Sequence, residues 1–251
     1  MSSDKNVANI NPINRLLAIM ARLRSPTDGC EWDLAQDFES ISRYTIEEAY
    51  EVADAIQSGN SSSIKDELGD LLLQVVFHSQ IAVDKNLFVF DDVCNAISDK
   101  MERRHPHIFG DTQTLDVKKQ WEEIKAKERA EKGEKKILDG IALSLPALMR
   151  AQKIQSRVSR VGFDWPDVDG PRAKILEELA EVDGAVDADH RAEEVGDLLF
   201  AVVNYARHLG VDAEAALASA NHKFSRRFGH VEAAAGAELA TMTIEQLDKL
   251  W

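Results

Sequence analysis

Residues 64–76 read IKDELGDLLLQVV and place two carboxylates, Glu67 and Asp70, inside a strongly apolar run. On a helix that turns by about 100° per residue, these acids share one face with Gln74 and His78. The other faces carry apolar side chains, namely Leu68, Leu71, Leu72, Leu73, Val75, Val76 and Phe77. This apolar collar predicts that the helix is buried. Because buried carboxylates are neutralised, paired with a base or bound to a metal, the stretch is a candidate site.

A second copy of this pattern, EVGDLLFAVV, lies at residues 194–203. Further matches place the two halves of the chain in register: EEAYE at 47–51 with EELAE at 177–181, ELGDLL at 67–72 with EVGDLL at 194–199, and KMERR at 100–104 with KFSRR at 223–227. The segments between the acidic motifs differ in length, as a surface turn tolerates. The repeat therefore predicts two copies of one structural unit.

Helical periodicity runs through most of the chain, whereas strand signals are nearly absent and aromatic residues make up only 6%. The predicted fold class is all-α, with two tandem repeated helical-bundle domains. The expected helices span residues 13–24, 44–57, 64–76, 90–104, 145–161, 173–186, 191–209 and 212–234, with a charged helix or linker at 116–136. The expected domain plan is a flexible tail at 1–12, an N-terminal domain at 13–115, a charged helical linker at 116–140 and a C-terminal domain at 141–251.

The charge balance argues against several classes of partner. Lys and Arg total 30 against 44 Asp and Glu, a net charge of −14, which disfavours nucleic acid and anionic membranes. Cys30 and Cys94 lie far apart without metal-ligand spacing, and the N-terminus has no signal-peptide pattern. No apolar run approaches the roughly 20 residues that span a bilayer. We therefore expect a reduced, cytoplasmic protein.

The acidic residues come in pairs three apart on successive helices. Glu48 and Glu51 form one pair, Glu67 and Asp70 the next, and antiparallel packing would bring the pairs face to face. Four converging carboxylates repel one another, and a hard cation such as Mg²⁺ or Mn²⁺ is the natural counter-charge. The repeated basic residues would neutralise substrate phosphates. The combination favours phosphoryl chemistry.

Other interpretations compete for these residues. A single ExxE pair usually marks a solvated helix face, and a lone basic cluster usually makes surface salt bridges. Trp32, Trp165 and Trp251 suit lids or core plugs better than base stacking. The ExxH spacing of Glu102 and His105 is compatible with a di-iron carboxylate bundle, which iron content would reveal. A non-enzymatic scaffold that binds nucleotides or a protein is the remaining rival, and it predicts no pyrophosphate release.

The duplicated ExxE and ExxD motifs are accompanied by GCEWD at 29–33, SDKMERRHPHIFG at 98–110, KIQSRVSRVGFDW at 153–165 and ANHKFSRRF at 220–228. Together they resemble the MazG nucleoside triphosphate pyrophosphohydrolases over nearly the whole chain. The resemblance implies two MazG-like domains and hydrolysis of NTPs and dNTPs to a monophosphate and pyrophosphate. It also implies Mg²⁺ dependence, a homodimer and a role in cleaning the nucleotide pool.

The resemblance further implies that the second half carries most of the catalysis. Its metal ligands would be Glu178, Glu181, Glu194 and Asp197. Mg²⁺ would polarise the α-phosphate, while Glu178 or Glu177 accepts the proton of the attacking water. The implied substrate-binding residues are Lys153, Lys223, Arg226, Arg227 and Trp251. The first half keeps a matching set, an active or regulatory second site: Glu48, Glu51, Glu67, Asp70, Lys100, Arg103 and Arg104.

Overall fold

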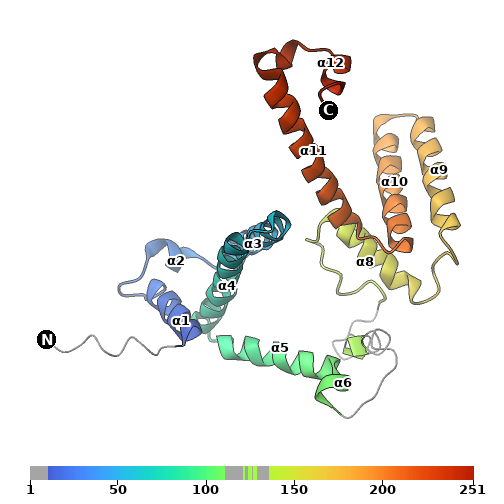
Figure 1. Ribbon diagram of the computed structural model, residues 1–251. Helices are drawn as coiled ribbons and strands as arrows, with labels where there is room; N and C mark the ends of the chain where they lie inside the picture. Colours follow the sequence, from blue (N-terminus) through green and yellow to red (C-terminus); the bar gives the residue numbers. More distant parts are fainter. Residues whose placement is uncertain (1–10, 111–120, 122–123, 126, 129–135) are drawn as a thin grey trace. The chain divides into compact units, whose positions relative to one another are not determined.

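The computed structural model describes residues 11–110, 121, 124–125, 127–128 and 136–251 (Figure 1). These residues form helices and connecting loops and contain no strand, which confirms the all-α prediction. The chain divides into two compact units, Met1–Ile124 and Lys125–Trp251. The predicted tail at 1–12 and linker at 116–140 lie largely outside the described residues. Among the helices that are described, none combines the length and apolarity needed to cross a bilayer.

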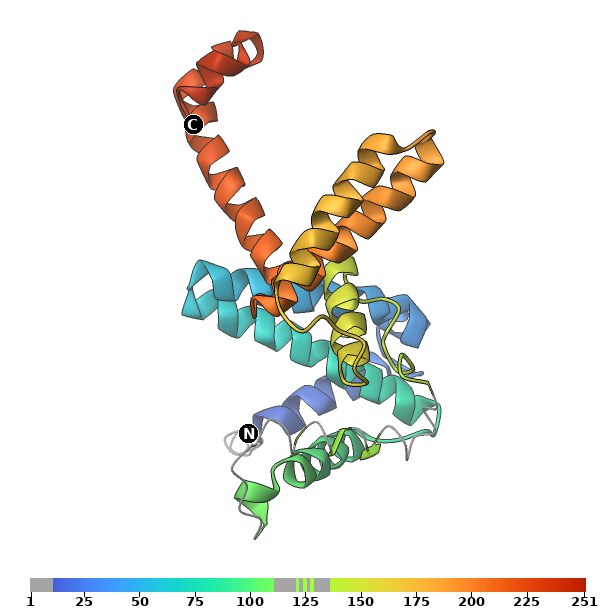
Figure 2. The ribbon, with the colours of Figure 1, turned by 90° about the vertical axis from the view of Figure 1, so that its right-hand side faces the viewer.

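The first unit is built on a hairpin of two long helices. Its described helices are α1 (Pro12–Leu23), α2 (Glu31–Ala35), α3 (Phe38–Ser58), α4 (Ser61–Asp84), α5 (Phe90–Arg104) and α6 (Pro106–Phe109). Helices α3 and α4 pack side by side and antiparallel, and α1 packs against α4 (Figures 1 and 2). One apolar cluster forms the core where these three helices meet: Met20, Ile41, Val76, Phe77 and Ile81.

Polar caps explain why α3 is longer than the predicted helix at 44–57. The Asp37 side chain accepts hydrogen bonds from the backbone N–H groups of Glu39 and Ser40, while Ser40 Oγ accepts from the Asp37 N–H. This capping box starts the helix at Phe38. Gly59 ends it with φ of 70°, a left-handed conformation that glycine adopts without strain.

The second unit repeats the hairpin. Its described helices are α8 (Ala147–Ser159), α9 (Asp169–Gly184), α10 (Ala188–His208), α11 (Ala213–Ala235), η1 (Gly236–Thr241) and α12 (Ile244–Asp248). Helices α9 and α10 lie side by side, and α8 packs against α10 (Figures 1 and 2). Helix α11 contacts α8 and α10 near its start and then diverges from the hairpin (Figure 1).

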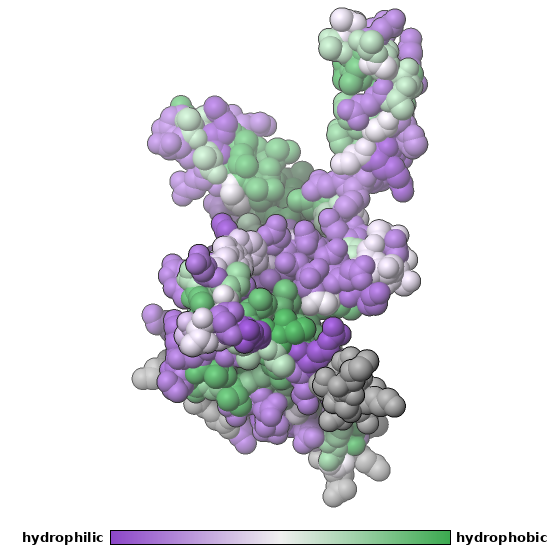
Figure 3. Space-filling view, turned by 90° about the vertical axis from the view of Figure 1, so that its left-hand side faces the viewer, coloured by the Kyte–Doolittle hydropathy of each residue, from purple (hydrophilic) through white to green (hydrophobic). Residues whose placement is uncertain are grey.

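The predicted burial of the apolar collar is only partly correct: Val76 and Phe77 lie in the core, whereas other members of the collar are exposed. Leu68 is 49% exposed and its counterpart in the second half, Val195, is 40% exposed. Leu72 and Leu199, one turn further along, are likewise exposed. Figure 3 shows apolar side chains at the surface of the chain. Each hairpin buries one side of α4 or α10 against its neighbours and leaves the other side uncovered.

Candidate functional site

The α9–α10 hairpin gathers three of the predicted metal ligands. Glu178 projects from α9, Glu194 and Asp197 project from α10, and one carboxylate oxygen of each lies within 4.8 Å of the other two. Glu178 is only 4% exposed. Glu181, one turn further along α9, is coupled to the same cluster: burial raises its pKa, and the charges of Glu178 and Glu194 raise it further. Three of the four predicted ligands therefore converge on one place, and Glu181 lies one turn further along α9.

Two basic side chains that the sequence reasoning missed also touch this cluster. Lys174 Nζ lies 2.6 Å from Glu178 Oε1 and 2.7 Å from Glu177 Oε1, and these hydrogen bonds raise the pKa of Lys174. His190 Nε2 lies 3.0 Å from Glu194 Oε1. Each partner stands four residues before its acid, so the i, i+4 spacing was the available signal.

The first half builds a matching cluster without those basic partners. Oxygens of Glu48, Glu67 and Asp70 lie within 4.8 Å of one another. The positions that correspond to Lys174 and His190 hold Tyr44 and Ser63. Burial and then the neighbouring acids raise the pKa values of Glu48 and Glu67. Crowded oxygen donors with raised pKa values are suited to a hard divalent cation.

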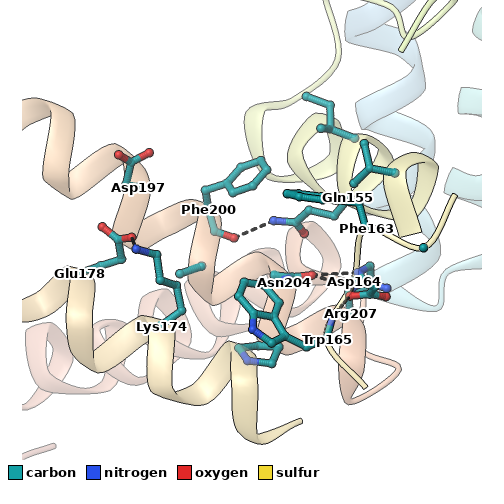
Figure 4. A pocket seen from close by; sticks show the side chains of 15 residues that line it. Gln155, Phe163, Asp164, Trp165, Lys174, Glu178, Asp197, Phe200, Asn204 and Arg207 are labelled. Atoms are coloured by element: carbon teal, nitrogen blue, oxygen red, sulfur yellow. Dashed lines mark hydrogen bonds and ion pairs between the residues drawn. The ribbon is translucent and has the colours of Figure 1, made fainter. Parts of the chain in front are cut away.

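A cavity of about 670 Å³ opens beside the second cluster (Figure 4). Lys174, Glu178 and Asp197 line one end, while the remainder is mainly apolar and includes Trp165 and Phe200. This volume falls within the roughly 300–1,000 Å³ of small-molecule pockets. The acidic cluster of the second half is thus joined to a space that can hold an organic ligand.

Comparison with known proteins assigns the family. The model of the MazG nucleotide pyrophosphohydrolase domain matches residues 36–109 and 171–232, more than half of the chain. The chain belongs to the MazG nucleotide pyrophosphohydrolase family. The two matched segments cover the α3–α4 hairpin and, except for the first two residues of α9, the α9–α10 hairpin, which supports the interpretation of two tandem MazG-like domains.

Two relatives match this MazG chain over almost its full length, and a third matches 73% of it and 63% of its own length. It is 51% identical to a nucleoside triphosphate pyrophosphohydrolase of Escherichia coli, over 96% of each chain. It is 47% identical to the nucleoside triphosphate pyrophosphohydrolase/pyrophosphatase MazG of Thermotoga maritima, over 94% of this chain and 92% of the relative. A nucleoside triphosphate pyrophosphohydrolase of Mycolicibacterium smegmatis is 37% identical over 73% of this chain.

The other predicted residues of this MazG chain lie outside the acidic cluster. Glu177 faces the exposed side of α9, and Lys153 is exposed on α8 and is not among the residues that line the cavity. The second basic cluster, Lys223, Arg226 and Arg227, is exposed on the diverging α11. There the Arg227 guanidinium lies 5.7 Å from the centroid of the Trp251 ring. In the first half, Lys100, Arg103 and Arg104 lie on α5.

The geometry disfavours the di-iron alternative. The candidate metal clusters among the described residues consist of carboxylates alone. His105, which would have to be a ligand, belongs to neither cluster. A site with oxygen donors alone favours Mg²⁺ or Mn²⁺ over the iron of a di-iron site, which needs an imidazole ligand.

Proposed function

We propose that the chain hydrolyses nucleoside triphosphates, both NTPs and dNTPs, between the α- and β-phosphates to a monophosphate and pyrophosphate. The observation that carries this proposal is the cluster of Glu178, Glu194 and Asp197 beside an organic-sized cavity. Membership of the MazG family and relatives named nucleoside triphosphate pyrophosphohydrolase support it. Such an activity would remove unwanted nucleotides from the cellular pool.

The proposed cofactor is Mg²⁺, with Mn²⁺ as a substitute. Glu178, Glu181, Glu194 and Asp197 would hold it, since they offer oxygen donors that repel one another without a cation. When bound, the ion would neutralise phosphate charge and polarise the α-phosphate. The first-half cluster of Glu48, Glu67 and Asp70 offers the same donors and would form a second, active or regulatory, metal site.

The chain's own residues would position the substrate and move the proton. Lys174 holds the carboxylates of Glu177 and Glu178 on either side of its Nζ. One of these two carboxylates would accept the proton of the attacking water, and Lys174 would then be free to meet a phosphate oxygen. His190 holds Glu194 in the same way on α10. These contacts fix the acids in place before the substrate arrives.

A homodimer is the second part of the proposal. The outer faces of α9 and α10 leave Leu179, Val195 and Leu199 exposed, and a second copy would bury them. Helix α11 carries its basic residues away from the acidic cluster of its own hairpin (Figure 1). We propose that Lys223, Arg226 and Arg227 grip phosphates in the assembled dimer, with Trp251 and Lys153 nearby.

Product analysis tests the proposed reaction. Purified chain with Mg²⁺ is incubated with a panel of NTPs and dNTPs, and pyrophosphate and orthophosphate are measured separately. We expect pyrophosphate and the nucleoside monophosphate in equal amounts, and no turnover when the metal is chelated. Orthophosphate as the sole product would refute the proposal, and no product with any substrate would favour a non-enzymatic regulator.

A further inference from the structure

The cavity of the second half contains a buried hydrogen-bond acceptor without a partner in the described part of the chain. Gln155 on α8 is 4% exposed, and its Nε2 donates to the carbonyl oxygen of Phe200 at 2.8 Å. A carbonyl can only accept, so the amide must be oriented with Oε1 on the opposite side. That Oε1 atom is buried and has no hydrogen-bond partner among the residues that the structure describes. Leaving a buried acceptor unpaired is costly, so such a group calls for a ligand donor.

Asn204 presents the complementary group on the same cavity. Its Oδ1 accepts from Nε of Arg207 at 2.9 Å and from a second guanidinium nitrogen at 2.8 Å. Arg207 in turn bonds Asp164 Oδ1 at 2.5 Å, which holds the network against the loop before α9. Because Oδ1 is held by Arg207, the amide nitrogen of Asn204 is the end left to donate (Figure 4).

An aromatic wall completes the cavity. Trp165 lies against the start of α9, where a Cβ atom added at Gly170 would come within 2.0 Å of the Trp165 ring. Phe163 and Phe200 also line the space, which leads to Lys174 and Asp197 (Figure 4). Flat apolar walls with one acceptor and one donor suit a planar heterocycle that carries both an N–H group and a ring acceptor.

Alignment of the two halves places apolar side chains at the corresponding positions of the first half. Aligning the starts of α1 and α8 places Met20 opposite Gln155, and aligning Glu67 with Glu194 places Phe77 opposite Asn204. Met20 and Phe77 belong to the buried core of the first unit, and the Phe77 ring centroid lies 6.4 Å from that of Trp32. Three identical pairs support the register of α1 and α8, namely Arg15 with Arg150, Ile19 with Ile154, and Arg22 with Arg157.

We infer that the second-half cavity binds the nucleobase, with Gln155 Oε1 accepting from a base N–H and Asn204 donating to a base acceptor. In the first half, Met20 and Phe77 close the same position, so that its acidic cluster binds a metal and phosphate groups but not the base. This inference rests on the proposed function for the identity of the ligand. It explains in physical terms why two similar acidic clusters would act differently.

Equilibrium binding to the full chain tests this pocket. The probes are non-hydrolysable α,β-imido triphosphates of the four bases and, as a ligand without a base, inorganic tripolyphosphate, each titrated calorimetrically with Mg²⁺. The variant Gln155→Met removes the acceptor and introduces the first-half residue. The matched control is Ser156→Ala, a neighbouring change on α8 outside the cavity lining.

We expect wild-type chain and Ser156→Ala to bind the imido triphosphates more tightly than tripolyphosphate and to differ among the bases. Gln155→Met should weaken nucleotide binding by roughly threefold to tenfold and reduce the differences among bases, with tripolyphosphate affinity unchanged. Equal weakening of both kinds of ligand, or no change in either, would overturn the inference. If Gln155→Met does not fold, fluorescence of the wild-type chain replaces it as the test. Quenching of Trp165 by nucleotide but not by tripolyphosphate, with the quenching lost in Trp165→Phe, supports the pocket. Absence of this quenching refutes the pocket.

These outcomes separate the pocket from the reaction. Binding of imido triphosphates needs no hydrolysis, so a wild-type chain that binds them with base selectivity but releases no pyrophosphate from NTPs would retain the pocket and refute the proposed function. A chain that releases pyrophosphate but binds tripolyphosphate as tightly as every nucleotide would retain the proposed function and refute the pocket.

Discussion

At the scale of single residues, Lys174 occupies the position where a cation would bind. Its Nζ lies 2.6 Å from Glu178 Oε1, so it competes with a metal ion for that carboxylate. Lys174→Met should therefore strengthen Mn²⁺ binding by up to about 1 kcal/mol, or roughly fivefold, because the side chain is partly exposed. Calorimetric titration with Mn²⁺ measures this, with Lys174→Arg as the control that keeps the charge.

The same variant should slow turnover if Lys174 meets a phosphate oxygen. Tighter metal binding together with slower pyrophosphate release is the combination expected for Lys174→Met. Weaker metal binding would show instead that Lys174 supports the shape of the acidic cluster, and the competition argument would be wrong.

The pH dependence of stability reports on the first-half cluster. Burial and the neighbouring acids raise the pKa of Glu67 above its ordinary 4.5. The folded chain therefore holds this proton to a higher pH than the unfolded chain, so stability falls as pH rises through the folded pKa. Without metal, Glu67→Gln should be as stable as wild type at low pH and more stable than wild type at pH values above the folded pKa of Glu67.

Thermal unfolding of wild type and Glu67→Gln with a chelator, from about pH 4 to about pH 8, measures this difference. Asp37 and Asp164 have lowered pKa values and change stability in the opposite direction, but they do so equally in both proteins. A difference that does not vary with pH would contradict the assignment. Added Mg²⁺ should stabilise the wild type more at high pH than at low pH, because protons and metal compete for the same oxygens.

The acidic clusters could be predicted from the sequence, and the i, i+4 spacing offered a signal for their basic partners, whereas the cavity could not be predicted. Glu178, Glu194 and Asp197 meet because i, i+3 spacing on two antiparallel helices leaves little choice. The predicted burial of Leu68 failed, since an apolar collar does not say whether its own chain or another covers it. In the sequence, Gln155 is an ordinary helix residue. Only the packing of α8 against α10 shows that its side chain faces the Phe200 carbonyl.

At the scale of elements, the start of α9 depends on Gly170. Any Cβ at this position would come within 2.0 Å of Trp165 Cδ1 and 2.3 Å of Cγ. Gly170→Ala should therefore displace Trp165 and cost about 1–3 kcal/mol, the usual cost of overpacking. The matched control is Gly229→Ala in α11, where a Cβ would meet no atom of the described residues within 4 Å apart from the helix's own backbone, and where alanine should stabilise the helix by about 0.5–1 kcal/mol.

Chemical denaturation of the two glycine variants separates these effects, and the emission of Trp165 reports on its displacement. Equal stabilisation by both alanines would show that Trp165 does not pack on α9 as described.

The helices themselves followed from periodicity, but α3 begins six residues before the predicted start because the Asp37 capping box extends it. The divergence of α11 had no sequence signal, since its apolar residues match those of a packed helix.

At the scale of the whole molecule, exposed apolar faces on both hairpins predict self-association. Sedimentation of the purified chain should give twice the mass of one chain. Replacing Leu199 by Glu would place a charge on the outer face of α10 and should shift the equilibrium towards monomer. A monomeric wild type with full activity would remove the dimer from the proposal and leave the basic residues of α11 without a role at the site.

The two halves should contribute unequally. Glu194→Gln or Asp197→Asn should lower pyrophosphate release by at least about 100-fold, since even the residues behind metal ligands commonly contribute 10- to 100-fold. Glu67→Gln and Asp70→Asn should leave much of the activity, because the first half has the buried core residues Met20 and Phe77 at the positions of the inferred base contacts. Steady-state rates of the four variants measure this, and the opposite pattern would move the reaction to the first half.

Hydrolysis in water labelled with heavy oxygen tests the central claim most directly. If the carboxylate cluster directs water to the α-phosphate, mass spectrometry should find the label in the nucleoside monophosphate and none in the pyrophosphate. Label in pyrophosphate or in orthophosphate would place the attack on another phosphorus atom and contradict the proposed reaction.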